Sequence, residues 1–165
     1  MTPRRALPDT LKASRHALLA AADGLPREWW GERPGADEWS VLEVVAHLEG
    51  VDQHWLAQAL AMRDNPGHLF VHFDDTAWKA AHEGVRWQPP EEVLAKIGAS
   101  HRAVLSALAG MSEADLDRSG LHPRGLPYTV RDVFLRFPPH DEGHRRQIEE
   151  IRSALARSAG LQAGR

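Results

Sequence analysis

The sequence predicts an all-α protein built as an antiparallel four-helix bundle. Three observations support this fold class. Four segments have apolar residues at helical spacing, no segment shows strand-like alternation long enough to build a sheet, and 165 residues suffice for one domain with a proper core. We expect a single domain over residues 1–158, with residues 159–165 as a frayed tail, and a long crossover between the second and third helices.

Breaking and capping residues mark the first two helices. The first is expected from Asp9 to about Ala22, because Leu residues recur along it at helical spacing and Gly24 follows. The second is marked more clearly, since Ser40 and Glu43 have the spacing of a capping box. Valine, leucine and tryptophan then recur at helical spacing to about Met62, where a DNPG segment ends the helix.

Similar signals mark the second half of the chain. Residues 68–87 are irregular and form the crossover, in which an Asp-Asp-Thr segment has the composition of a cap for one short helix. The third helix is expected to open with the segment Pro89-Pro90-Glu91-Glu92 and to end at Gly110. Thr129, with Asp132 three residues later, begins the fourth helix after a turn-rich segment.

Two prolines interrupt this fourth helix. Pro138 and Pro139 lack backbone N–H groups and their rings clash with the preceding turn, so a kink or a restart is expected directly before His140. Pro139 suits the first turn of a restarted helix. The spacing between His140 and His144 is unaffected, because both follow the prolines.

Composition limits the possible functions. Apolar residues make up 42%, charged residues 26%, and the net charge is -3, as in ordinary globular proteins. No window approaches the ~20 apolar residues of a membrane span, so we expect a cytoplasmic protein without a membrane partner. A nucleic-acid partner is not expected, because no basic stripe is present. Without cysteine, any metal site must use imidazole, carboxylate or water.

Histidines on two helices have the spacing of a metal site. His140 and His144 are one helical turn apart, so their imidazoles can converge on one ion. His47 lies on the flank of the apolar stripe of the second helix, where a side chain points to the inner seam of a bundle. We therefore predict one divalent metal ion held by His47, His140 and His144, with Zn, Ni, Co, Fe or Mn all suited to the donors.

Other polar residues near these positions have alternative interpretations. Glu43 could orient a ligand or act as a general base, or serve only in the capping box. His101 could be a fourth ligand, a substrate contact or a proton carrier, although a hydrogen-bonded buried histidine is favoured. Asp141 could accept a hydrogen bond beside the metal or be a solvated carboxylate, and Gln147 could hydrogen-bond near the site. Five histidines are interpreted as non-ligands: His54, His68, His72, His82 and His122.

Three segments resemble the DinB-like superfamily. They are EWSVLEVVAHLEGVDQHW (38–55), TVRDVF (129–134) and HDEGHRRQI (140–148). The resemblance implies a four-helix bundle, commonly a homodimer, with a divalent metal held at the positions of His47, His140 and His144. Characterised relatives include thiol-dependent enzymes, namely mycothiol-dependent maleylpyruvate isomerase and bacillithiol S-transferases.

Two classes of function follow. The first is a metal-dependent enzyme acting on a small-molecule substrate, either a thiol-dependent S-transferase or a related hydrolase or isomerase, in which the ion activates a thiol or water. In the thiol version, a low-molecular-weight cofactor such as bacillithiol or mycothiol supplies the sulfur. The alternative is a non-catalytic, stress-related metal-binding or interaction protein. An enzyme needs a pocket beside the ion, whereas a binding protein does not.

Overall fold

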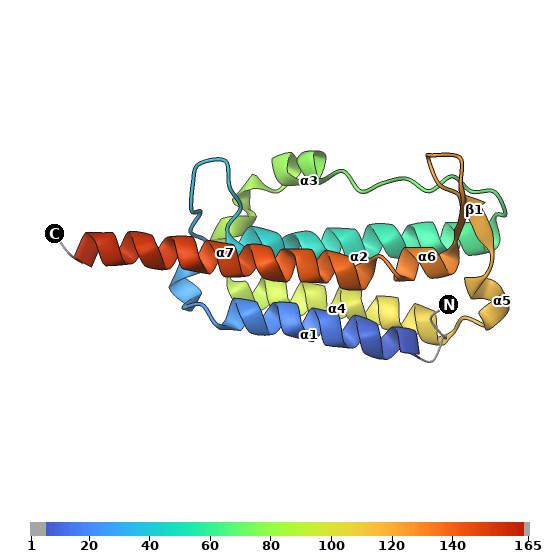
Figure 1. Cartoon of the computed structure of the whole chain (residues 1–165), viewed down its shortest axis with the longest axis horizontal. Helices are drawn as coiled ribbons and strands as arrows, with labels where there is room; N and C mark the ends of the chain where they lie inside the picture. The colour runs from blue at the N-terminus through green and yellow to red at the C-terminus, as the bar shows by residue number, and fades with distance from the viewer. Residues whose placement is uncertain (1–5, 164–165) are drawn as a thin grey trace.

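Four long helices run along the molecule and form its bundle (Figure 1). The computed structural model describes residues 6–163. The long helices are α1 (Leu7–Asp23), α2 (Val41–Asp64), α4 (Pro90–Ala109) and α7 (Phe137–Ala163). The predicted four-helix bundle is therefore confirmed.

Shorter elements connect these helices. They are the 3-10 helices η2 (Arg27–Trp29) and η3 (Glu83–Trp87), the helices α3 (Asp75–Ala81), α5 (Glu113–Leu116) and α6 (Val130–Phe134), and the strands β1 (Ser119–Leu121) and β2 (Pro127–Thr129).

Polar caps begin several helices where the sequence predicts them. The side chains of Ser40 and Thr129 accept hydrogen bonds from backbone N–H groups three residues later, at Glu43 and Asp132. The carboxylates of these two acids in turn accept from the N–H of the cap residue, which completes two capping boxes. Asp74 caps α3 through its side chain. The start of α2 and the short crossover helix are therefore as predicted.

The long crossover determines the directions of the helices. Residues 65–89 return along the outside of α2, with α3 lying over it, so α4 begins at the same end as α2 and runs parallel to it (Figure 1). Helices α1 and α7 run the opposite way. Because α1 packs mainly against α7, and α2 mainly against α4, the bundle consists of two parallel pairs that are antiparallel to each other.

The predicted interruption of the fourth helix occurs two residues before the prolines. α6 ends at Phe134 and α7 begins at Phe137, so Pro138 and Pro139 lie in the first turn of α7, where their missing N–H groups are not needed. The N–H of His140 donates to the carbonyl of Arg136 at 3.2 Å. The helix then continues to Ala163, through most of the segment that was expected to be a frayed tail.

A small β-hairpin precedes the fourth helix, so the expectation of no sheet is wrong for this segment. Gly120 of β1 pairs with Tyr128 of β2, and Gly125 supplies the positive φ of the turn between them. Strands of three residues are too short to show alternation in the sequence. The crossover is tied to this hairpin, since the Phe70 N–H donates to the Leu121 carbonyl at 2.8 Å.

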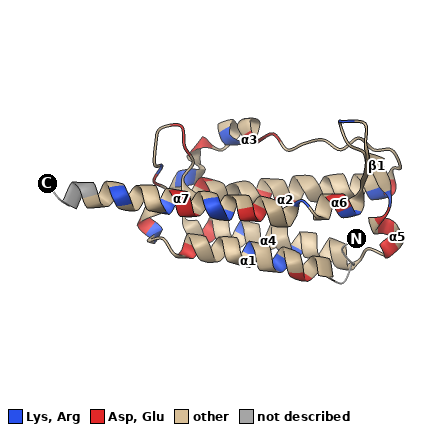
Figure 2. Cartoon of the chain, viewed as in Figure 1, with Lys and Arg blue, Asp and Glu red and all other residues tan. Residues whose placement is uncertain are grey.

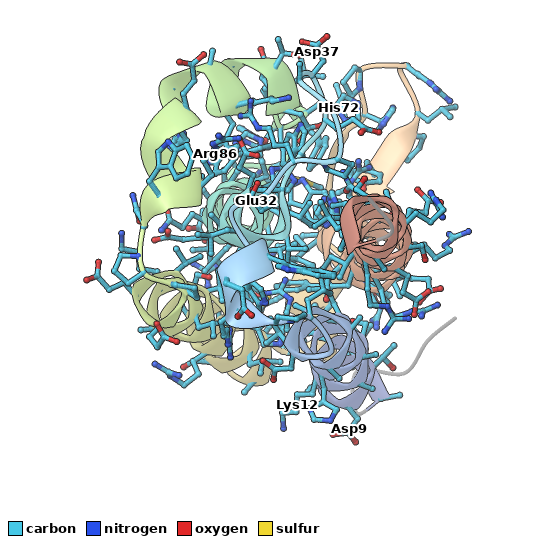
Figure 3. All side chains as sticks on the ribbon, turned by 90° about the vertical axis from the view of Figure 1, so that its left-hand side faces the viewer. Asp9, Lys12, Glu32, Asp37, His72 and Arg86 are labelled. Carbon is cyan, nitrogen blue, oxygen red and sulfur yellow. The ribbon has the colours of Figure 1, made fainter. Side chains whose placement is uncertain are left out.

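The buried apolar residues form two clusters along the bundle. Trp55 and Phe137 belong to the cluster at the hairpin end, and Leu48 and Ile148 belong to the cluster at the other end. Viewed end-on, side chains fill the space between the helices, while Lys12 points outward from α1 (Figure 3). Figure 2 shows both signs of charge interspersed along the helices. None of the described helices is long and apolar enough to cross a bilayer.

Candidate metal centre

Three histidines from α2 and α7 converge between the two core clusters. The Nε2 atoms of His47 and His140 are 3.4 Å apart, and those of His140 and His144 are 3.1 Å apart. One ring nitrogen from each residue lies within 4.8 Å of the other two. The structure thus brings together the three residues that the sequence selects, and the restart of α7 does not separate them.

Aromatic rings surround the triad. The rings of Trp39, Phe73 and Trp78 lie edge-on to the His47 imidazole, with centroids 5.1 to 5.4 Å away, and Trp55 contacts His140 in the same manner. These rings bury His47 almost completely, whereas His140 and His144 are half-buried.

This burial keeps the imidazoles neutral. It lowers the pKa of His47 to about 3 and that of His140 to about 2, and the neighbouring His144 contributes to both shifts. The pKa of His144 is also lowered, again mainly by burial. A metal ion binds neutral imidazole, so no proton has to be displaced from these rings at neutral pH.

The donor set fits a divalent cation. Gln147 accepts a hydrogen bond from Nδ1 of His144 at 2.8 Å, which leaves the lone pair of His144 on Nε2, facing the other two rings. Nδ1 of His47 and of His140 have no hydrogen-bond partner among the described residues. Lone pairs that converge at these distances repel one another unless a proton or a cation lies between them, and burial disfavours extra protons.

Glu43 is part of the helix cap and not of the triad. Its carboxylate accepts hydrogen bonds from the backbone N–H of Ser40 and from the guanidinium of Arg33. These bonds lower the pKa of Glu43, against the opposing and larger single effect of burial. The capping interpretation therefore accounts for Glu43, and its carboxylate is already engaged by other groups.

Asp141 points into the bundle, where it binds a buried arginine. Arg15 Nε lies 3.1 Å from Asp141 Oδ2, and the same guanidinium donates to both carboxylate oxygens of Asp52. Ser14 and Ser100 donate to the two carboxylates. Of the two interpretations of Asp141, the solvated one is wrong, because the side chain is fully buried. Its hydrogen-bond donors are Arg15 and Ser14, and neither is a triad imidazole.

His101 lies outside the triad, and it is not hydrogen-bonded as the favoured interpretation requires. Both of its ring nitrogens are buried without a partner among the described residues. Burial lowers its pKa to about 4, with Arg15 and Lys12 acting in the same direction. Because α4 packs against α2 and α1, His101 faces charges on those helices. The fourth-ligand interpretation of His101 therefore has no support in the geometry.

The histidines interpreted as non-ligands have other surroundings. Nε2 of His54 contacts the Val71 carbonyl at 2.7 Å, and His82 stacks on Trp78. His72 and His122 contact each other near the hairpin. In residues 6–163, the triad alone forms a group of three suitable donors close enough for one ion.

Sequence reasoning missed Asp75 as a neighbour of the triad. Its Oδ1 lies 3.4 Å from Nε2 of His47, because α3 lies over α2. The Asp-Asp-Thr segment was identified only as a helix cap. The position of the short helix over α2 depends on the path of the crossover, and periodicity carries no signal for that path.

Two cavities lie next to the aromatic rings of Trp39, Phe73 and Trp78, which surround His47. One of about 420 Å³ is lined by Asp75, Lys79 and other residues of α3 and by Arg33, Trp39 and other residues of the loop before α2. The other, of about 550 Å³, is lined by Phe73 and Trp78. Neither cavity is lined by a triad histidine. Each cavity is lined by residues that contact His47, namely Asp75 and Trp39 in the first and Phe73 and Trp78 in the second.

A helical bundle with a largely buried histidine triad between two of its helices defines a class of candidate metalloproteins, and comparison with known proteins specifies the family. The model of the DinB superfamily matches residues 10–148. The chain belongs to the DinB superfamily.

Individual relatives are distant. The uncharacterized protein YuaE of Bacillus subtilis (strain 168) is 24% identical over 158 residues, which cover 82% of this chain and 90% of that protein. Among solved structures, YfiT from Bacillus subtilis is described as "a probable metal-dependent hydrolase with an unusual four-helix bundle topology". It matches with a TM-score of 0.76 and 16% identity over 93% of this chain and 87% of its own.

A second solved structure shares the fold. The mycothiol-dependent maleylpyruvate isomerase matches with a TM-score of 0.70 and 10% identity, over 87% of this chain and 60% of its own. Identities this low establish the common fold alone.

Proposed function

We propose that this protein is a divalent-metal-dependent enzyme whose metal ligands include His47, His140 and His144. The observation that carries the proposal is the convergence of three neutral imidazoles, each presenting Nε2, in a water-poor cage. Three imidazoles leave coordination positions for other ligands, as in catalytic zinc sites and unlike closed structural ones. The cavity of about 420 Å³ next to the triad has room for a small-molecule substrate.

A divalent ion at this position would lower the pKa of a thiol or water that binds to it, and would thereby supply a nucleophile at neutral pH. The chain provides the surroundings for this chemistry. Gln147 fixes the ring orientation of His144, and the rings of Trp39 and Trp78 shield the triad from solvent.

The nucleophile is a low-molecular-weight thiol or water, and the proposed reaction class is group transfer, isomerisation or hydrolysis of a small molecule. The absence of cysteine is compatible with the thiol version, since the sulfur would come from a cofactor such as bacillithiol or mycothiol. Two proteins of the same fold support these versions, since one is described as a probable metal-dependent hydrolase and the other as a mycothiol-dependent maleylpyruvate isomerase. The non-catalytic alternative, a metal-binding protein, does not require a cavity beside the ion and leaves this cavity unexplained.

Elemental analysis of purified protein tests the metal site. The parent, stripped with a chelator and resupplied with Zn, Ni, Co, Fe or Mn in turn, is expected to retain about one equivalent of at least one of them. His144→Ala should reduce the affinity by at least about tenfold. His54→Ala is the matched control, because this histidine lies on α2 outside the triad and contacts the Val71 carbonyl. Retention of no metal by the parent would remove the basis of the proposal.

A thiol screen separates the versions of the enzyme. Saturable activation of the loaded protein by one low-molecular-weight thiol supports the transferase or isomerase version. Turnover of ester or amide substrates without any thiol supports the hydrolase version. A loaded protein that performs neither reaction favours the non-catalytic alternative.

A further inference from the structure

A carboxylate of the crossover lies beside the triad, and among the described residues it neither caps a helix nor pairs with a lysine or arginine. Asp75 is the first residue of α3, and its Oδ1 is 3.4 Å from Nε2 of His47. The N-terminus of α3 is capped by Asp74, whose side chain accepts from the Ala77 N–H, so Asp75 is not the capping residue. No lysine or arginine among the described residues forms an ion pair with Asp75, so its charge is available.

The distance from Asp75 to His47 is that of two ligands on one ion, although Asp75 lies outside the group of donors that are all within 4.8 Å of one another, so its side chain has to turn further toward the other two imidazoles to bind. With bonds of about 2.0 to 2.1 Å, neighbouring ligand atoms on one ion lie roughly 2.9 Å apart in octahedral and roughly 3.3 Å apart in tetrahedral coordination, and a five- or six-coordinate ion keeps a position for the nucleophile beside four protein ligands. The two measured separations between imidazole Nε2 atoms are 3.4 Å for His47 and His140, and 3.1 Å for His140 and His144. The separation of 3.4 Å between Asp75 and His47 belongs to the same range.

Charge and mobility favour the same role. Three neutral imidazoles leave the two positive charges of a divalent ion uncompensated inside an aromatic cage, and one carboxylate would neutralise half of that charge. The Asp75 side chain is 66% exposed, so little packing holds it away from an ion. The helix that carries it is anchored nearby, because Trp78 packs against Gly50 of α2 and stacks on Trp39.

We propose that Asp75 is a fourth protein ligand of the ion, supplied by the crossover. This inference rests on the proposed metal site of the three histidines. An ion held in this way would link α3 to α2 and α7. It also places the carboxylate where a molecule entering from the 420 Å³ cavity, which Asp75 lines, first meets the ion.

Cobalt binding to the full-length protein tests this role. The parent, Asp75→Asn and Asp74→Asn are titrated with Co²⁺ against a competing chelator, and their visible absorption is recorded. Asp74→Asn is the matched control, because it makes the same charge change one residue away and Asn also caps helices. We expect Asp75→Asn to bind about tenfold more weakly or worse, with an altered Co²⁺ spectrum, and Asp74→Asn to behave like the parent.

Hydrogen exchange gives a readout that does not depend on activity. Metal should slow the exchange of amides in residues 75–81 of the parent, and this protection should be lost in Asp75→Asn. The reason is that an ion bound to Asp75 and to the histidines links α3 to α2 and makes local opening of α3 less favourable. Asp75→Ala, which lacks any polar replacement, should give the same result. If the parent binds Co²⁺ and both Asp75 variants match its affinity and spectrum, Asp75 is not a ligand and the three-histidine site stands. If the parent binds no metal, both proposals are overturned.

Discussion

Buried imidazoles occur in two different surroundings in this bundle. In the triad, low pKa values leave His47 and His140 neutral and able to bind an ion. At His101 the pKa is lowered to about 4 by the same burial, but the ring nitrogens have no partner among the described residues. The neutral ring is therefore useful to a metal in the first case. At His101, the lowered pKa instead destabilises the folded protein as the pH falls.

Replacing His101 by leucine should reduce the dependence of stability on pH. The unfolded chain takes up a proton on this ring near pH 6.5, whereas the folded chain does so only near pH 4, so protonation favours unfolding as the pH falls between these values. His101→Leu removes that effect. We compare the free energy of unfolding of the variant with that of the parent at each pH. This difference should favour the variant by about 2 kcal/mol more at pH 5 than at pH 8. Urea denaturation of the metal-free proteins measures this difference, and parallel pH profiles would contradict it.

Local signals in the sequence were sufficient for several residues of the site. The i, i+4 spacing of His140 and His144 and the phase of His47, together with the resemblance to the DinB-like superfamily, predicted that these three imidazoles lie close together, as they do. The capping spacing of Glu43 already offered the correct explanation of that carboxylate. Each of these relations lies within one helix, where periodicity fixes the direction of a side chain.

At the scale of elements, the close approach of the crossover to α2 depends on a glycine. A Cβ on Gly50 would lie 2.9 Å from Trp78 Nε1 and 3.1 Å from Phe73 Cζ. Both rings belong to the cage around His47. The absence of a side chain at position 50 therefore allows the crossover to cover the triad.

Gly50→Ala should displace the crossover, although alanine is the better helix former by about 1 kcal/mol. The added methyl group overlaps Trp78 and Phe73, so we expect a shift in tryptophan fluorescence and faster hydrogen exchange in residues 71–82. Gly143→Ala on α7 is the control, since a Cβ there meets no atom within 4 Å. It should stabilise the protein and leave the crossover unchanged. Equal exchange rates in both variants would show that Gly50 is not needed for the close approach.

Elements with strong local signals were predictable, and elements defined by pairing were not. Capping boxes and prolines marked the starts of α2 and α4 and the interruption before α7. The hairpin of β1 and β2 was missed because its strands have three residues each. Its pairing with the crossover at Leu69 and Leu121 joins residues more than 50 positions apart, and a single sequence contains no local trace of that contact.

At the scale of the whole molecule, a polar layer separates the two apolar clusters. The layer contains the triad and the ion pairs of Arg15 with Asp52 and Asp141, which join α1, α2 and α7, while Ser100 adds α4. All four long helices therefore meet in one hydrogen-bonded layer next to the proposed metal site. Asp141 directly follows His140, so the same layer fixes the start of α7.

The polar layer also shows why the site was only partly predictable. Arg15 lies on the buried face of α1, but its two partners are 37 and 126 residues away in the sequence. Asp75 reaches the triad only because the crossover folds back over α2. These relations depend on which helices are neighbours, and the amphipathic pattern of one helix does not specify its neighbour.

Arg15→Met should destabilise the metal-free protein by about 3 to 5 kcal/mol, because it leaves the buried carboxylates of Asp52 and Asp141 without a counter-ion. Chemical denaturation measures the loss, with Arg63→Met, which breaks an exposed ion pair, as a control expected to change little. Adding Asp52→Asn and Asp141→Asn to Arg15→Met removes both unpaired charges, so the triple variant should regain much of the lost stability. If it is no more stable than Arg15→Met, the arginine acts through packing of its alkyl chain, and the helices are not held together by charge.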